Sequence, residues 1–218
     1  MWSGWHQTKS KFQNPKFKVA AGQISACTVP LIFDLRLLTS DLCSSMNLSD
    51  ACRRVELILS DVDGVLTDGQ IWYDNQGVEL KGFHIRDGLG IRLWQRAGFR
   101  FGILTARASH IVKLRASELG IDIVRQGFED KLPAAQEIIR ECHLTPDQVC
   151  YIGDDLTDLP VMRAVGLGAA VADAPAEVRT AAAVTTQLAG GRGAVRELIE
   201  SILKAKNRWE DAVQRYMS

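Results

Sequence analysis

Short apolar segments alternate with amphipathic segments from residue 55 to about residue 205, and no other feature of the sequence constrains the fold as strongly. The apolar segments are typical of strands buried on both faces of a parallel sheet. They lie at 55–60, 99–105, 121–126, 149–154 and 167–172. We expect helices at 88–97, 109–119, 131–142 and 157–165, and a last helix from Gly193 to Met217. The pattern predicts an α/β fold with a doubly wound parallel sheet.

One segment, QIWYDNQGVELKGFH at 70–84, departs from this alternation. Its centre, Asn75-Gln76-Gly77, is typical of a turn, and apolar or aromatic residues flank the turn on both sides. We therefore predict a β-hairpin inserted after the first strand. The spacing of the remaining segments leaves no room for a second domain, so residues 46–218 are expected to form one domain.

The first 45 residues show no comparable pattern and are predicted to be a poorly ordered extension. An apolar run, VPLIFDLRLL, is interrupted by Asp34 and Arg36, which argues against a secretory signal. Met46 opens a segment typical of the start of a domain. A true start of translation at Met46 and a genuine flexible arm both stay open.

Charge balance and cysteine content narrow the class of function. Lys and Arg together number 26, as do Asp and Glu, so the formal net charge is zero. This balance removes the usual electrostatic case for a nucleic-acid or anionic-membrane partner. The five cysteines are widely spaced and form no CxxC, which is typical of reduced thiols. We expect a cytoplasmic protein that binds neither nucleic acid nor a membrane.

Acidic, hydroxyl and basic side chains come directly after the predicted strands. The stretch LILSDVDG places Asp61 and Asp63 after the first strand. Thr105 ends the second strand, Asp154 follows the fourth, and Lys131 opens the helix after the third. Because the carboxyl ends of parallel strands meet at one edge of a sheet, we expect these five residues to converge there.

Two carboxylates one residue apart on an extended segment point the same way and repel each other unless a cation lies between them. Mg²⁺ prefers hard oxygen ligands, which Asp61, Asp154 and Asp63, the last through its carbonyl, would supply. Asp61 could attack phosphorus, with Asp63 as general acid and then general base. Thr105 and Lys131 would hold the phosphoryl oxygens. These residues predict magnesium-dependent phosphoryl transfer.

The order DVDGVLTDG, ILTAR, Lys131 and GDDLTDLP resembles the four motifs of the haloacid dehalogenase superfamily of phosphatases, over about residues 55–205. GFHIRDGLGIRL, TARASHIVKLRASELGI and GGRGAVREL look like its subgroup of 3-deoxy-D-manno-octulosonate 8-phosphate (KDO-8-phosphate) phosphatases. The resemblance implies a Rossmann-like core without a cap domain, a Mg²⁺ cofactor, an aspartyl-phosphate intermediate and a homotetramer. It implies hydrolysis of KDO-8-phosphate to KDO and phosphate, a step in lipopolysaccharide precursor synthesis.

The resemblance assigns roles position by position, and these agree with the chemistry above for Asp61, Asp63, Thr105, Lys131 and Asp154. It further implies substrate contacts by Asp63 and Lys131 and by a second set of residues: His84, Ile85, Arg86, Asp87, Gly88, Arg92, Arg107 and Arg115. Guanidinium groups suit the carboxylate of a sugar acid. From the sequence alone, each of these arginines could equally lie on a solvated face, and His84 could equally be structural.

Several interpretations stay open beside these assignments. Either Asp155 or Asp158 could position a metal-bound water, and either could simply cap the following helix. GGRG at 190–193 is interpreted as a flexible turn, because no P-loop lysine and serine follow it.

Two rival functions also stay open. One is a phosphatase for another sugar acid phosphate, such as sialate 9-phosphate. The other is a catalytically silent oligomeric scaffold, against which the intact Asp61/Asp63 pair argues. The apolar hairpin favours a homotetramer with the hairpins at its centre, in which a neighbouring subunit supplies part of the substrate specificity.

Overall fold

A six-stranded parallel sheet forms the centre of the protein, as seen in a computed structural model that describes residues 48–217. Its strands are β1 (Leu57–Ser60), β4 (Arg100–Thr105), β5 (Ile123–Gln126), β6 (Val149–Gly153), β7 (Leu167–Ala170) and β8 (Val184–Thr185). They lie in the order β5-β4-β1-β6-β7-β8, and every neighbouring pair is parallel. Because β1 lies between β4 and β6, the loop that follows it is central at the carboxyl edge.

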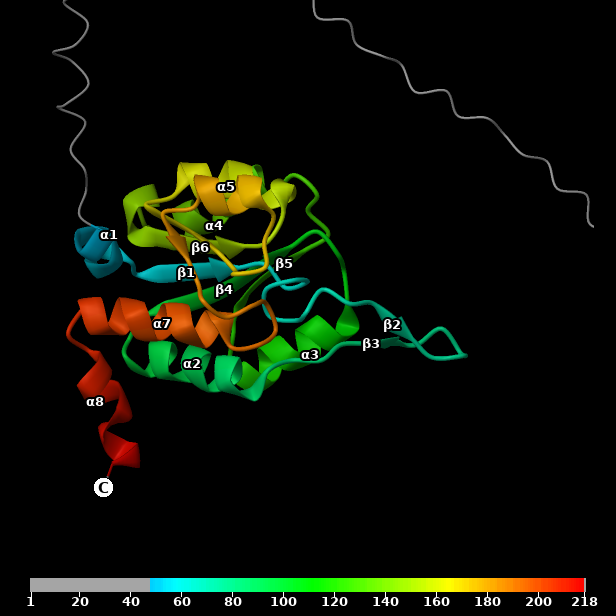
Figure 1. The fold of residues 1–218 in the computed structure, drawn as a ribbon, viewed down its shortest axis with the longest axis horizontal. Coiled ribbons are helices and arrows are strands. Elements are labelled where there is room, and N and C mark those ends of the chain that lie inside the picture. Colours follow the sequence, from blue (N-terminus) through cyan, green and yellow to red (C-terminus); the bar gives the residue numbers. More distant parts are fainter. Residues whose placement is uncertain (1–47, 218) are drawn as a thin grey trace, which may run out of the picture. The chain divides into compact units, whose positions relative to one another are not determined.

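Helices cover both faces of this sheet (Figure 1). One face carries α4 (Lys131–Glu141) and α5 (Leu159–Ala164), and the other carries α2 (Ile85–Arg96), α3 (His110–Leu119) and α7 (Ala194–Ala205). Three shorter helices are α1 (Leu48–Arg54), which packs on α7, α6 (Ala176–Ala181), which packs on α5, and α8 (Trp209–Val213), which packs on α2 and α7. The predicted doubly wound α/β fold is confirmed.

The core lies between the sheet and these helices. All four residues of β1 are buried, as expected for a central strand with helices on both sides. On α7, Val195, Leu198, Ile199 and Ile202 are buried, a spacing that places them on one helix face. Burying each such side chain contributes about 1.5–3 kcal/mol to folding. This face of α7 is therefore a major support of the sheet.

The predicted last helix, from Gly193 to Met217, is wrong in its second half. The helix ends at Ala205, and Asn207 adopts a left-handed backbone conformation with a φ of 55°. The amide of Arg208 donates to the carbonyl of Leu203 (2.8 Å), the hydrogen bond that closes a helix with such a residue. The chain then turns into α8 at Trp209. Likewise, the helix predicted at 157–165 begins as a 3-10 turn over Leu156–Asp158, and α5 proper starts only at Leu159.

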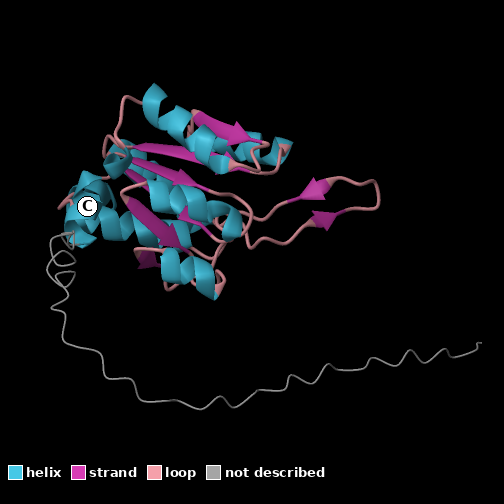
Figure 2. Ribbon diagram, turned by 90° about the horizontal axis from the view of Figure 1, so that it is seen from above, coloured by secondary structure: helices cyan, strands magenta, loops and turns pink. Residues whose placement is uncertain are grey.

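The predicted hairpin is confirmed and projects from the body of the domain (Figure 2). Its strands, β2 (Trp72–Tyr73) and β3 (Glu79–Leu80), are short and antiparallel. Asp74 Oδ1 stabilises the turn by accepting from the amides of Gln76 (2.9 Å) and Val78 (2.8 Å). Gly77 there has a φ of 79°, which favours glycine.

The prediction made for residues 1–45 lies outside the described residues. Within residues 48–217, no helix combines the length and the apolar character that a membrane crossing requires.

Candidate active site

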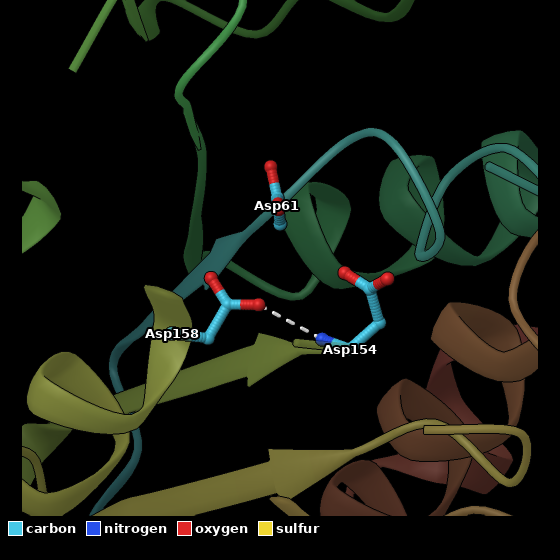
Figure 3. Close-up of side chains that lie close together, drawn as sticks. All are labelled: Asp61, Asp154 and Asp158. Atoms are coloured by element: carbon cyan, nitrogen blue, oxygen red, sulfur yellow. Dashed lines mark hydrogen bonds between the residues drawn. The ribbon is translucent and has the colours of Figure 1, made fainter. Parts of the chain in front are cut away.

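Three carboxylates meet at the carboxyl edge of the sheet (Figure 3). Asp61 directly follows β1, Asp154 directly follows β6, and Asp158 comes from the turn after β6. One carboxylate oxygen from each lies within 4.8 Å of the others. The strand ends thus bring Asp61 and Asp154 together, as expected from the sequence.

Lys131, the first residue of α4, is buried beside them. Its ammonium donates to Asp61 Oδ2 and to Asp158 Oδ1, both at 2.6 Å. Asp158 Oδ1 also accepts from the hydroxyl of Tyr151 (2.6 Å), and its Oδ2 accepts from the amides of Asp154 (2.9 Å) and Asp155 (3.1 Å). Both oxygens of Asp158 are therefore occupied by the protein. We conclude that Asp158 orients Lys131 and the 154–155 turn.

The sequence had left the roles of Asp155 and Asp158 undecided, and the structure separates them. Asp155 caps the 3-10 turn, since its Oδ1 accepts from the amide of Leu156 (2.7 Å). Asp158 is fully buried within the site. The pattern GDDLTD marked both residues, but only their burial distinguishes a cap from a member of the site.

The site has more negative charge than Lys131 can balance. Burial first, and then the charge of Asp158, raise the pKa of Asp61 to about 6 although Lys131 opposes the shift. Burial and the charges of Asp61 and Asp158 raise the pKa of Asp154 to about 8. Burial alone would lower the pKa of Lys131, yet the two neighbouring carboxylates outweigh it and the net shift is upward. A cation placed between Asp61 and Asp154 would relieve this imbalance.

The loop after β1 makes room for such a cation. Gly64 has a φ of 88°, and a Cβ atom there would lie 1.9 Å from Asp154 Oδ2. Only glycine leaves the Asp154 carboxylate in place. The carboxylate oxygens of Asp61 and Asp154 are the kind of hard donor that Mg²⁺ prefers. The residues therefore fit a divalent metal ion.

Two groups are available to hold a phosphoryl group. Thr105, the last residue of β4, is buried, and its hydroxyl has no hydrogen-bond partner among the described residues. β4 is the direct neighbour of β1 in the sheet, so this hydroxyl lies on the same edge as Asp61. A buried hydroxyl without a partner is costly unless a ligand satisfies it. Lys131 supplies a positive charge on the same edge.

Asp63 belongs to a second group of charges, here called the Asp63 cluster: Asp63, Glu79, Lys81 and Arg107. Lys81 donates to Asp63 Oδ1, and Arg107 Nε lies 3.8 Å from Asp63 Oδ2. Glu79 accepts from Arg107 Nη2 (2.7 Å) and from the hydroxyl of Ser109 (2.7 Å). The Ser109 hydrogen bond is the main cause that lowers the pKa of Glu79. Sequence reasoning had placed Arg107 near substrate but missed Glu79 and Lys81.

The other predicted substrate residues form a separate group on α2 and α3. His84 caps α2, since its Nδ1 accepts from the amide of Arg86 (3.3 Å). Arg92 donates to the carbonyl of Glu118 (2.7 Å), and Arg115 pairs with the Glu118 carboxylate (3.0 Å). Arg115 also borders a depression of about 340 Å³ between α2 and α3. Across residues 48–217, no hydrogen bond or ion pair joins this group to Asp61 or to the Asp63 cluster.

The remaining members of that group differ in exposure. Ile85 is largely exposed, and Gly88 is buried. Asp87 is also buried, which raises the pKa of its carboxyl, and it accepts from the amide of Arg196 (2.8 Å). Asp87 therefore ties α2 to the start of α7.

The GGRG segment at 190–193 is not a loose connection, which corrects the interpretation from sequence. The amide of Gly191 donates to the carbonyl of Val65 (2.8 Å). A Cβ atom on Gly190 would lie 1.7 Å from the carbonyl oxygen of Gly64. The glycines therefore allow this segment to pack directly on the loop that carries Asp61 and Asp63.

Comparisons with known proteins agree with this geometry. A family model described as haloacid dehalogenase-like hydrolase matches residues 91–198. The KDO-8-phosphate phosphatase of Yersinia pestis is 46% identical over 158 residues, which span 72% of this chain and 84% of that protein. The same enzyme of Escherichia coli K12 is 43% identical over equal shares.

Solved structures are also similar to this chain. A KDO-8-phosphate phosphatase from Moraxella catarrhalis, in complex with magnesium, phosphate and KDO, matches with a TM-score of 0.76 and 38% identity over 78% of this chain and 97% of that one. The Yersinia pestis enzyme matches with a TM-score of 0.73 and 44% identity over 74% and 88%. With identity at this level over most of both chains, this chain belongs to the haloacid dehalogenase-like hydrolases.

Proposed function

We propose that this protein is a magnesium-dependent phosphomonoesterase and that its substrate is KDO-8-phosphate. The observation that carries the proposal is the setting of Asp61. Its carboxylate is held by Lys131 at 2.6 Å, with Asp154 close by. The similarity to KDO-8-phosphate phosphatases supports the choice of substrate.

Asp61 is the proposed nucleophile. One of its oxygens bonds to phosphorus while the bond from phosphorus to the sugar oxygen breaks, which leaves an aspartyl-phosphate. The position of Asp61 is fixed by its amide, which donates to the carbonyl of Ile152 (3.1 Å), and by the amide of Val62, which donates to its Oδ1 (2.6 Å). The attacking group is therefore preorganised.

Asp63 is the proposed general acid and base. It gives a proton to the departing sugar oxygen in the first step, and it takes a proton from the attacking water in the second. In that second step the water oxygen bonds to phosphorus, and the bond between phosphorus and Asp61 breaks. Thr105 and Lys131 donate to the phosphoryl oxygens throughout. Asp61, Asp154 and the carbonyl of Asp63 would hold Mg²⁺, whose charge reduces repulsion between Asp61 and the anionic substrate.

Arg107 is the proposed contact for the sugar acid carboxylate nearest to this centre. Its side chain is 37% exposed and lies at the border of the Asp63 cluster. A guanidinium group can grip a carboxylate with two parallel hydrogen bonds. The segment 84–88, Arg92 and Arg115 are proposed to contact the substrate as well, but in the site of a neighbouring subunit, because among the described residues no hydrogen bond or ion pair joins them to Asp61 or to the Asp63 cluster.

Substrate contacts from a neighbouring subunit require several chains to associate, and we propose a homotetramer with the hairpins at its centre. Five apolar side chains of the hairpin are 51–60% exposed in the single chain: Ile71, Trp72, Tyr73, Val78 and Leu80. A two-stranded ribbon this apolar is marginal on its own and invites pairing. We also propose a cytoplasmic location, which the free and buried thiols of Cys52, Cys142 and Cys150 support.

A panel of phosphorylated sugar acids tests the proposed function. With Mg²⁺ present, kcat/KM should be highest for KDO-8-phosphate and clearly lower for sialate 9-phosphate and its deaminated relative. Asp61→Asn should lower turnover of every substrate, including p-nitrophenyl phosphate, by several orders of magnitude. A preference for a nine-carbon acid would overturn the choice of substrate. Activity of Asp61→Asn within about tenfold of the unmodified protein would overturn the nucleophile.

A further inference from the structure

The inner face of the hairpin carries two charged side chains, Glu79 and Lys81, whose role is not explained by the function above. They alternate with Val78 and Leu80, which are 54% and 55% exposed. Side chains on an extended segment alternate between two faces. The segment 78–81 therefore has an apolar outer face and a charged inner face, and the inner face contacts Asp63.

The side chain of Lys81 is buried although it is charged. Its side chain is 1% exposed, and its ammonium donates to Asp63 Oδ1 and lies 3.5 Å from Glu79 Oε1. A buried ammonium group is costly unless carboxylates pair with it. With so little exposed surface, Lys81 has no room for a substrate contact, so it acts through the carboxylates that it touches.

We propose that Lys81 is a positioning residue for Asp63, which rests on the role of Asp63 as general acid and base proposed above. Asp61 is held by its strand and by Lys131, but Asp63 lies in the turn beyond the strand. Lys81 contacts one oxygen of Asp63, and Arg107 lies 3.8 Å from the other. Removing Lys81 frees the carboxylate to turn toward Arg107. A displacement of about 1 Å can cost a rate factor of about 10².

Glu79 anchors this arrangement to the body of the domain. Its carboxylate accepts from Arg107, which follows β4, and from the hydroxyl of Ser109 at the start of α3. Ser109 is itself held, because its amide donates to Gln126 Oε1 (2.6 Å). Lys81 is therefore fixed relative to the sheet edge, and the projecting part of the hairpin can serve assembly without moving it.

The choice of substrate separates positioning of Asp63 from general damage to the site. p-Nitrophenolate leaves as a stable anion with its electron pair, so transfer of its phosphoryl group to Asp61 needs no proton from Asp63. The second step still needs Asp63, because the attacking water must lose a proton as its oxygen bonds to phosphorus. An alkyl phosphate, such as a sugar phosphate, needs Asp63 in both steps.

Lys81→Met, which keeps the length of the side chain without its charge, tests the proposal by rapid mixing with p-nitrophenyl phosphate and Mg²⁺. We expect a burst of about one p-nitrophenolate per chain, followed by turnover reduced about 10- to 100-fold. Turnover of KDO-8-phosphate should fall at least as far, without a burst of released sugar. Lys81→Arg, which restores the cation, should recover part of the second step. Should Lys81→Met fail to fold, Lys81→Gln takes its place.

Lys206→Met is the matched control. The side chain of Lys206 is also buried, at 7% exposed, and it pairs with Glu56 (3.2 Å) before the amino end of β1. Its loss should leave the kinetics of both steps unchanged. The proposal is overturned if the Lys81 variant turns over KDO-8-phosphate at the original rate, or if it slows both substrates equally without a burst. Asp63→Asn separates failure of the proposed function from failure of the role of Lys81. If Asp63→Asn stays active, the acid/base role of Asp63 and the positioning role of Lys81 both fail. If Asp63→Asn is inactive and the Lys81 variant is unaffected, only the role of Lys81 fails.

Discussion

Burial and two neighbouring carboxylates raise the pKa of Asp154 to about 8, so protons would compete near neutral pH with the metal ion proposed to bind there. In the metal-free protein, a raised carboxyl pKa stabilises the fold fully at acidic pH, and this contribution is lost as the pH rises toward about 8. The raised pKa of the Asp61 carboxyl, about 6, makes stability depend on pH in the same direction. We therefore expect the Tm in EDTA to fall between pH 5 and pH 9, and the rise in Tm caused by Mg²⁺ to grow over the same range.

Asp154→Asn is the control for this experiment, because it removes the titrating group and a proposed metal ligand together. The variant should lose most of the Mg²⁺ effect and should be less sensitive to pH in EDTA. At this chain length, 1 kcal/mol corresponds to about 2–4 °C, which thermal unfolding measures readily. A Mg²⁺ effect of equal size at pH 6 and pH 9 would show that Asp154 is already ionised without metal.

Among individual residues, the sequence predicts the site residues at strand ends and misses the residues that contact and orient them. Asp61, Thr105 and Asp154 follow directly from the positions of buried strands. Asp158 and Lys81 do not, because their roles depend on burial and on contacts between segments distant in the chain. The charges at 79 and 81 do alternate with apolar neighbours, and this pattern was the available signal for an inward-facing pair.

Among the elements, the hairpin is the one proposed to link assembly of the chains to substrate specificity. Ile71→Glu combined with Val78→Glu places charges among the exposed apolar side chains of the hairpin and should break the oligomer. Activity on KDO-8-phosphate should fall more than activity on p-nitrophenyl phosphate, because the small ester needs no contact from a neighbouring subunit. Light scattering and parallel assays measure both effects. Leu48→Glu, at an exposed position of α1, is the control that should leave the assembly intact. A fully active monomer of about 24.1 kDa would refute the link between the hairpin and specificity.

A second prediction at this scale concerns the GGRG segment. Gly190→Ala places a methyl group against the backbone of Gly64, where neither partner is a flexible side chain. Overpacking of this kind costs about 1–3 kcal/mol, so the Tm should fall by several degrees and activity should fall with it. Gly82→Ala is the control, because a Cβ atom at Gly82 meets nothing within 4 Å. Equal behaviour of the two variants would mean that the segment does not support the loop.

The sequence predicted strands and helices wherever an apolar run or a helical period extended over enough residues. Five strands and the helices between them follow from apolar runs and periodicity, whereas β8 and α6 are too short to give a clear period. The break after α7 had a local signal in Asn207, a residue that tolerates the left-handed conformation, but the helical pattern on both sides concealed it.

For the molecule as a whole, the prediction is that residues 1–45 are dispensable for folding and catalysis. Their sequence offers no periodic apolar face, and residues from Leu48 onward supply the sheet and a buried core of their own. Deleting 1–45 should change the Tm by less than about 2 °C, and specific activity should stay the same. Deleting residues 1–55 removes the buried Ala51 and Cys52 of α1 and should destabilise the fold clearly. A large loss of Tm in the shorter deletion would show that the extension packs on the domain.

The contact between Gly191 and Val65 also has a consequence for synthesis on the ribosome. The loop with Asp61 and Asp63 is among the first parts of the domain to leave the exit tunnel, but its neighbour strand β6 and the glycines that pack on it follow much later. A nascent chain therefore carries Asp61, the proposed nucleophile, in an unfinished setting through most of elongation. Chains released before residue 191 lack the segment that completes this loop, so incomplete products are not expected to hydrolyse phosphate esters in the cell.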